Sequence, residues 1–236
     1  MPDLLVGLVV LVGAVVQGAA GYGMNLVAVP LVALIDPRFL PVPLLLIASA
    51  HGLLALVREY GDTDWSGVGW AMLGRVPGTA LGVLAVATLA ERPFSVVVGA
   101  AVLACVVLSV LSWRPRPTRG PLLVAGVASG AFSTAASIGG PPIALLYQHS
   151  PGPTIRATLA ATFGLGTLLS LAGLGVGGQV HLTHFVFAAW LLPFLLAGFL
   201  LSGPARRFLD GGRMRVAVLT ISGASALALL VRAAVG

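Results

Sequence analysis

The sequence has very few charged residues. Only 8% of its 236 residues are charged, whereas 58% are hydrophobic. A typical soluble domain has about 25% charged residues, which cover its surface. The composition therefore excludes an ordinary soluble fold and indicates that most of the chain lies in a lipid bilayer. Long apolar runs satisfy their backbone hydrogen bonds in lipid as helices, so we expect an all-α integral membrane protein.

Lysine is absent and cysteine is nearly so. All 13 basic residues are Arg, and the formal net charge is +6. Most of them lie in short segments between apolar runs, which indicates control of membrane topology and not nucleic-acid binding. The single Cys105 excludes an internal disulfide and is better read as a small core side chain than as a metal ligand. The start, Met1-Pro2-Asp3, lacks a basic region, so we expect no cleaved signal peptide.

No acidic residue lies in the middle of an apolar run. All seven acids fall at segment ends or in loops: Asp3, Asp36, Glu59, Asp62, Asp64, Glu91 and Asp210. This argues against a sodium or proton site built on a buried carboxylate, against a cationic substrate, and against proteolysis by paired aspartates. His181 and His184 are three residues apart, but no third metal ligand is near them. We expect neither a metal nor a cofactor.

Eight apolar segments follow one another along the chain. They lie at about 4–35, 40–57, 66–90, 93–113, 120–149, 154–177, 184–203 and 214–234. Six have about 18–25 residues, enough to cross a bilayer once. The first and fifth are longer and are interrupted, by three glycines within 18–23 and by Ser-Ile-Gly-Gly-Pro-Pro at 137–142. Glycine and proline disfavour helix interiors, so each is predicted to split into two helices, the second opening at 23–25 and at Pro141 or Pro142.

The sequence also repeats itself. Pro77 and Gly82 recur as Pro193 and Gly198, because 193 − 77 and 198 − 82 both give 116. Each half consists of one interrupted segment followed by three plain ones, which indicates two four-segment repeats. The predicted domains are residues 1–113, a basic cytoplasmic linker at 114–119, and residues 120–236.

The Arg residues predict how the two halves are oriented. The positive-inside rule places the Arg-rich loops 114–119 and 206–215 both in the cytoplasm, which three simple crossings between them would prevent. If the first and fifth segments dip into the bilayer and return, nine Arg lie in cytoplasmic loops and three lie outside. If all eight segments instead cross the membrane once, seven Arg lie on one side and five on the other, which is almost no bias. The count favours inverted repeats with broken or re-entrant first and fifth segments, a plan common in secondary transporters.

The two interruptions are the main candidates for a binding site. A helix that restarts inside a membrane exposes N–H groups at the positive end of its dipole, and such ends bind anions. Neutral hydrogen-bonding side chains surround both interruptions, although glycines alone can also serve close helix packing. The cluster is not a nucleotide fingerprint, because no strand precedes it. The candidate substrate-binding residues here are Gln17, Gly21, Tyr22, Gly23, Asn25, Ser133, Thr134, Ser137, Gly139 and Gly140.

Two ionisable residues inside apolar segments complete the candidate site. Arg75 lies about ten residues into the third segment, where a permanent charge needs a polar partner. It can grip an oxyanion with its planar fork, or it can snorkel to the interface or cap nearby carbonyls. His51 can bind an anion when protonated or shuttle a proton, or it can be a neutral residue bonded to a neighbouring helix. Both alternatives stay open for each residue.

Two stretches resemble a known family. GAAGYGMNLVAVPLVAL at 18–34 and STAASIGGPPIALLY at 133–147, with the four-plus-four order of segments, resemble the sulfite exporter TauE/SafE family of membrane permeases. The resemblance covers nearly the whole chain. It implies a multi-pass anion transporter of the bacterial inner membrane that moves sulfite, organosulfonates or related sulfur oxyanions. It assigns no role to Arg75 or His51, which rest on the physical argument alone.

The sequence thus predicts a secondary transporter of small oxyanions, with sulfite, thiosulfate and organosulfonates as the expected substrates. No nucleotide-binding motif is present, so a gradient is the expected driving force. The expected partners are the small anion and the lipid bilayer, with no nucleic acid, and a homodimer is left open. The alternatives are a non-transporting membrane partner subunit and an intramembrane enzyme. A polar cavity shared by the two interruptions would favour transport over both.

Overall fold

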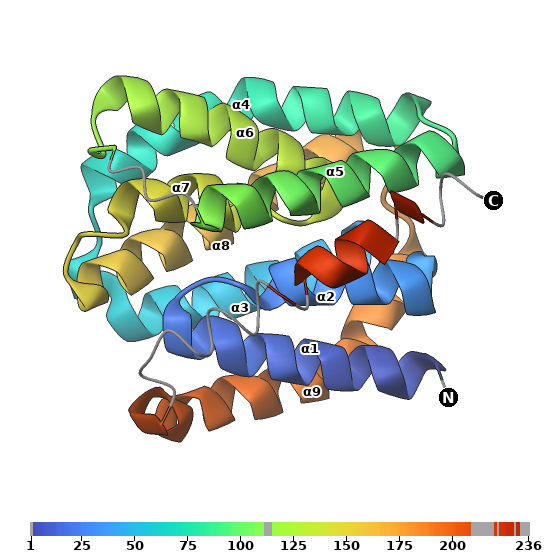
Figure 1. The fold of residues 1–236 in the computed structure, drawn as a ribbon, viewed down its shortest axis with the longest axis horizontal. Helices are drawn as coiled ribbons and strands as arrows, with labels where there is room; N and C mark the ends of the chain where they lie inside the picture. The colour runs from blue at the N-terminus through green and yellow to red at the C-terminus, as the bar shows by residue number, and fades with distance from the viewer. Residues whose placement is uncertain (1, 111–114, 209–219, 221, 229, 232–236) are drawn as a thin grey trace.

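The chain folds into a bundle of helices that run roughly along one common direction (Figure 1). The computed structural model describes residues 2–110, 115–208, 220, 222–228 and 230–231, and no strand is found within them. The helices are α1 (Pro2–Ala20), α2 (Met24–Ile35), α3 (Val42–Glu59), α4 (Trp65–Thr88), α5 (Glu91–Val110), α6 (Arg119–Ala136), α7 (Gly140–Tyr147), α8 (Gly152–Val176) and α9 (Leu182–Phe208). Two short 3₁₀ turns, η1 (Pro37–Phe39) and η2 (Tyr60–Asp62), follow α2 and α3.

Among the described residues, four helical stretches are long and apolar enough to cross a membrane. They are Val42–Asp62, Trp65–Thr88, Gly152–Val176 and Leu182–Pro204. Each matches one of the six single spans expected from the sequence. A fifth expected span, 93–113, forms α5, but its apolar part, Pro93–Leu108, is shorter. The sixth, 214–234, lies mostly outside the described residues, as do Arg114 and residues 209–215 of the Arg-rich loops.

Both interrupted segments form two helices. α1 ends at Ala20 and α2 begins at Met24, with Gly21 and Gly23 between them at φ of 87° and 119°. L-residues with side chains rarely adopt these values, so glycine is needed at both positions. Gly18 lies within α1, although we expected the turn to begin there. A side chain at this position would overlap Ser202 of α9, so Gly18 serves helix packing instead.

The second interruption is built differently from the first. α6 ends at Ala136, and Ser137 takes a left-handed φ of 58°. Its backbone N–H closes the helix end by donating to the Ser133 carbonyl at 2.7 Å. α7 then begins at Gly140, with both prolines of the motif in its first turn. Proline is well placed there because the first N–H groups of a helix have no partner within it.

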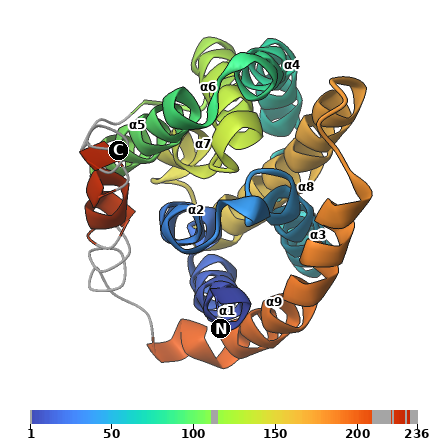
Figure 2. The same cartoon turned by 90° about the vertical axis from the view of Figure 1, so that its right-hand side faces the viewer.

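Helices from the two halves of the chain pack against one another. α1 packs against α9, α4 against α6, and α3 against α8, as the end-on view shows (Figure 2). The α3–α8 contact is close, since a side-chain carbon on Gly52 would lie 2.7 Å from the backbone nitrogen of Gly164. The antiparallel pairs α1–α2 and α6–α7 also pack together. These contacts bring the two interruptions toward the middle of the bundle.

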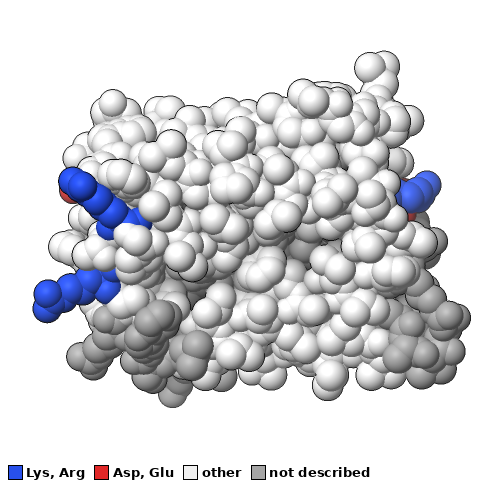
Figure 3. Space-filling model, turned by 90° about the horizontal axis from the view of Figure 1, so that it is seen from above, with Lys and Arg blue, Asp and Glu red and all other residues white. Residues whose placement is uncertain are grey.

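Apart from the buried Arg75, the charged side chains of the described residues lie toward the two ends of the bundle. The face in Figure 3 has Arg and acidic residues at its ends and an uncharged surface between them. The α3–α4 loop, the α7–α8 loop and the start of α6 lie at one end (Figure 1). The η1 turn and the α8–α9 loop lie at the other. An uncharged belt between two polar ends is what a lipid-embedded bundle requires.

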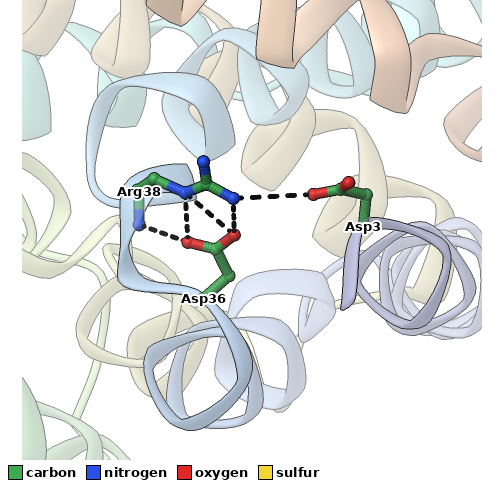
Figure 4. A network of polar contacts seen from close by, with 3 residues as sticks. All are labelled: Asp3, Asp36 and Arg38. Atoms are coloured by element: carbon green, nitrogen blue, oxygen red, sulfur yellow. Dashed lines mark hydrogen bonds and ion pairs between the residues drawn. The ribbon is translucent and has the colours of Figure 1, made fainter. Parts of the chain in front are cut away.

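A polar network closes the end that holds η1 (Figure 4). Asp36 accepts hydrogen bonds from the backbone N–H of Arg38 at 3.1 Å and from its Nε at 2.9 Å. The hydrogen bonds from the Arg38 guanidinium hold the pKa of the Asp36 carboxyl below its ordinary value of 3.8. Asp3 lies 3.9 Å from Arg38, but both side chains are about half exposed or more. Asp36 therefore fixes the turn, and Asp3 contributes little.

Candidate functional site

One cavity is lined by both helix interruptions. It has about 400 Å³ of empty volume, part of which is open to solvent. Its lining residues are Gln17, Gly23, Asn25, Leu26, Ala48, Ser133, Ser137, Ile138, Gly139, Gly140, Pro141, Phe163 and Thr167. They come from α1, α2, α3, α6, α7, α8 and the two interruptions, and none carries a charge. We call this space the central cavity.

Asn25 joins the two interruptions directly. Its Nδ2 donates to the backbone carbonyl of Ser137 at 2.6 Å, across 112 residues of sequence. The Ser137 hydroxyl in turn donates to the Pro41 carbonyl at 2.9 Å. The other amide atom, Asn25 Oδ1, is buried and has no partner among the described residues. A buried acceptor of this kind requires a donor, which a bound water or the O–H of a protonated oxyanion would supply.

Gln17 and His51 form a chain of hydrogen bonds beside the cavity. The N–H of Met24, the first residue of α2, donates to Gln17 Oε1 at 3.2 Å, which fixes the orientation of the Gln17 amide. Gln17 Nε2 then faces His51 Nδ1 at 3.1 Å, and His51 Nε2 lies 3.3 Å from the Ala14 carbonyl. An amide nitrogen only donates and a carbonyl only accepts. His51 is therefore neutral here, with its proton on Nε2, and its role as an anion ligand stays a prediction.

Arg75 lies behind the wall of the central cavity and does not line it. Its side chain is fully buried, and Nη1 donates to Ser129 Oγ at 2.7 Å. The Ser129 hydroxyl donates to the Gly139 carbonyl in the second interruption at 2.5 Å. Gly166 of α8 leaves room for the guanidinium, since a side chain there would overlap it. Arg75 Nε and Nη2 are buried without a partner among the described residues.

The helix N-termini offer fewer free donors than the sequence argument assumed. At the start of α2, the Met24 N–H is already bonded to Gln17. At the start of α7, Pro141 and Pro142 have no N–H group. Gly139 and Gly140, which precede the two prolines, do carry N–H groups. An anion in the central cavity would therefore rely on side chains as much as on helix ends.

The remaining candidates divide between the cavity wall and its surroundings. Seven of the twelve line the central cavity: Gln17, Gly23, Asn25, Ser133, Ser137, Gly139 and Gly140. Gly21 and His51 line a neighbouring cavity. Thr134 donates to Ser170 Oγ at 2.8 Å, and Tyr22 packs against the cluster that contains Phe163. These two residues support the wall.

Sequence reasoning missed several lining residues. Leu26, Ala48 and Phe163 are apolar, and nothing in an apolar segment distinguishes them from core residues. Thr167 did carry a signal. It is a polar residue within an apolar segment, and 167 − 51 gives 116, the spacing that also separates Pro77 from Pro193. Applying the repeat to His51 would have identified it.

Comparison with known proteins places the chain in a family. No curated protein and no solved structure matches it. The family model described as sulfite exporter TauE/SafE matches residues 5–229. The match includes both interruptions and every residue that lines the central cavity. The chain therefore belongs to the sulfite exporter TauE/SafE family.

Proposed function

We propose that the protein is a secondary transporter of small oxyanions, with sulfite, thiosulfate and organosulfonates as candidate substrates. The family suggests a membrane permease that exports anions such as sulfite. One observation carries the finer proposal: the two interruptions meet through Asn25 and Ser137 and line one uncharged cavity that holds polar side chains from both of them. Binding at the junction of two broken helices is common in secondary transporters. A gradient would drive the transport.

The charge around the central cavity suits an anion. The acidic residues within the described part of the chain lie at helix ends or in loops, away from this cavity. Arg75 is separated from it by one hydrogen-bonded residue, Ser129. The attraction between two opposite charges is stronger in the low-dielectric interior of a protein than at the same separation in water. Neutral donors can then orient the anion while Arg75 supplies the attraction.

The helix boundaries support alternating access by two inverted repeats. Subtracting 116 from the bounds of α6, 119–136, gives 3–20, and α1 spans 2–20. The same subtraction takes the first residue of α7, 140, to 24, where α2 begins. The contacts are reciprocal too, because α1 packs on α9 as α6 packs on α4. α1 and α6 start at opposite ends of the bundle (Figure 1), as inverted halves would.

Flux measurements test this proposal. Purified protein in proteoliposomes should take up one or more of these anions in a saturable way, driven by an imposed gradient. The same anion should raise the melting temperature of the protein, because it binds the native state. Asn25→Asp is the matched variant, since it keeps the side-chain shape but replaces the donor to Ser137 by a negative charge. Flux should fall at least about tenfold, the effect of 1.4 kcal/mol. No saturable flux of any of these anions, or normal flux in Asn25→Asp, would overturn the proposal.

A further inference from the structure

A second cavity lies beside the central one. It has about 270 Å³ of empty volume, part of which is open to solvent. Its lining residues are Gln17, Gly18, Gly21, His51, Gly52, Ala55, Arg58, Glu59, Arg156 and Ala160. Gln17 also lines the central cavity, so this side chain forms part of the partition between the two spaces. The second cavity is near the end of the bundle where α3 ends and α8 begins.

Unlike the central cavity, this one has charged walls. Arg156 Nε donates to Glu59 Oε2 at 2.8 Å, and Arg58 Nε lies 3.7 Å from Glu59 Oε1. The Arg58 and Arg156 side chains are 31% and 28% exposed, whereas Glu59 is 10% exposed. Two cations thus face the space around one largely buried carboxylate. The charged groups of this lining sum to a net positive charge.

Both arginines are held in place by contacts with other helices. Arg58 Nη2 donates to the Gly18 carbonyl at 3.4 Å, and its guanidinium lies 4.5 Å from the Phe199 ring centroid. Arg156 crosses the first interruption at Gly21, where a side-chain carbon would lie 3.1 Å from Arg156 Cγ. Asp64, an acid at the same end, does not line the cavity. Its carboxylate caps α4 and accepts from the Tyr147 hydroxyl at 2.7 Å.

We propose that this second cavity is an anion-binding vestibule from which the oxyanion passes to the central cavity. Arg58 and Arg156 are its binding groups, and Gln17 is the partition. The proposal rests on the proposed function for its ligand class, a small oxyanion. Partly exposed arginines in a walled space raise the local anion concentration, and their hydration keeps binding weak enough for release.

The hydrogen bonds of Gln17 hold its side chain between the two cavities. Its side chain must turn for an anion to pass, which breaks its bonds to Met24 and His51. The Met24 N–H, at the positive end of α2, then becomes free to bind the arriving anion. Opening the partition therefore creates a donor on the inner side.

A thiol reaction tests the charge of the vestibule without relying on transport. Ala55 lines the cavity, and Cys105 is buried, so Ala55→Cys in a Cys105→Ala background places one reactive thiol there. A sulfonate-bearing methanethiosulfonate should react about threefold or more faster than an ammonium-bearing one, each relative to free thiol. Adding Arg58→Gln and Arg156→Gln should abolish that preference. Equal relative rates with both arginines present would overturn the vestibule and leave the proposed function untouched.

Flux provides the second test through variants with opposite effects. Arg156→Gln should raise the half-saturation concentration for the anion about threefold or more, and Glu59→Gln should lower it. The effect of Arg156→Gln should shrink at high ionic strength, because salt screens exposed charges. Arg38→Gln, at the other end of the bundle, is the matched control. It should change neither the half-saturation concentration nor its dependence on ionic strength. Normal half-saturation in folded Arg156→Gln, with wild-type flux intact, would overturn the vestibule alone. Absence of flux in the wild type would overturn the proposed function.

Discussion

Arg75 combines a permanent charge, full burial and unused donors. Nη1 is bonded to Ser129, but Nε and Nη2 have no partner within the described residues. Burying an unpaired charge costs several kcal/mol, and the described part of the chain places no acid in an ion pair with Arg75 to offset it. A bound oxyanion that approaches from the central cavity would offset that cost. Without any movement, the charge of Arg75 would attract an anion in the central cavity through the intervening Ser129. Direct contact between Arg75 and the anion would require Ser129 to shift.

Substitution of Arg75 separates its charge from its shape. Arg75→Lys keeps the charge but loses the fork, so we expect the half-saturation concentration for transport to rise about tenfold. Arg75→Ala should weaken transport further. Gly166→Ala should mimic Arg75→Lys, because the added methyl group displaces the guanidinium. Gly175→Ala, on the same helix with open space around it, is the control. Normal transport by folded Arg75→Ala would remove Arg75 from the mechanism.

Asp36 makes the stability of the folded protein depend on pH. Because hydrogen bonds from Arg38 depress its pKa in the folded state, Asp36 stabilises the fold above its ordinary pKa of 3.8. This stabilisation is lost as the pH falls through the depressed value. The melting temperature of the wild type should therefore fall toward that of Asp36→Asn as the pH drops below 3.8. Asp3→Asn should keep the wild-type profile, because Asp3 is half exposed and 3.9 Å from Arg38. Parallel wild-type and Asp36→Asn profiles would exclude this contribution of Asp36.

Residue roles were only partly predictable from the sequence. The polar type and position of Asn25 and Ser137 marked them as candidates, and both line the central cavity. The prolines that marked the second interruption also remove donors from it, which pattern reasoning overlooked. The vestibule escaped notice because Arg58 and Arg156 were counted as topology signals. Their shared contact with Glu59 depends on the packing of α3 against α8, which no local pattern encodes.

At the scale of elements, α4 and α6 pack closely against each other. Gly74 and Gly78 of α4 face the backbone carbonyls of Leu123 and Val127, and a side-chain carbon at either glycine would overlap these oxygens. Gly126 of α6 faces Ala71 of α4 in the same way. Small residues let helix backbones approach this closely in membranes. This pair holds Arg75 against the second interruption.

Glycine substitutions in α4 test this packing. Gly78→Ala should destabilise the protein by about 1–3 kcal/mol, because the methyl group has no room beside Val127. Gly69→Ala, in the same helix with no atom within 4 Å, should be neutral or stabilise by about 0.5–1 kcal/mol. Melting temperatures in detergent would measure both. Equal effects of the two substitutions would mean that α4 and α6 are not in such close contact.

The elements themselves were largely predictable, since long apolar runs and glycine–proline clusters decide where membrane helices begin and end. Segments 66–90 and 154–177 correspond to α4 and α8 within two residues at each end. The first interruption starts later than expected because Gly18 lies against α9 and stays helical. That distinction depends on a neighbour 184 residues away (202 − 18), and glycine content alone could not make it.

At the scale of the whole molecule, the charged ends give the bundle an orientation. Arg58, Arg119 and Arg156 lie at the end that holds the α3–α4 and α7–α8 loops, and Arg38 lies at the other. The positive-inside rule predicts that the first end is cytoplasmic. The vestibule is near that end, so in this state it would be open to the cytoplasm.

Cysteine labelling tests the topology on which inverted repeats depend. Gly120 lies in the first turn of α6, His149 follows the end of α7, and Val176 ends α8. In a Cys105→Ala background, Gly120→Cys and His149→Cys should both react with an impermeant thiol reagent only after cells are opened. Val176→Cys, 94% exposed at the opposite end, should react in intact cells. The physical reason is that α6 and α7 leave and return to the same end of the bundle (Figure 1), so the pair makes no net crossing. If Gly120→Cys and His149→Cys label from opposite sides, the fifth segment crosses the membrane, and the inverted arrangement is wrong whatever the transport assays give.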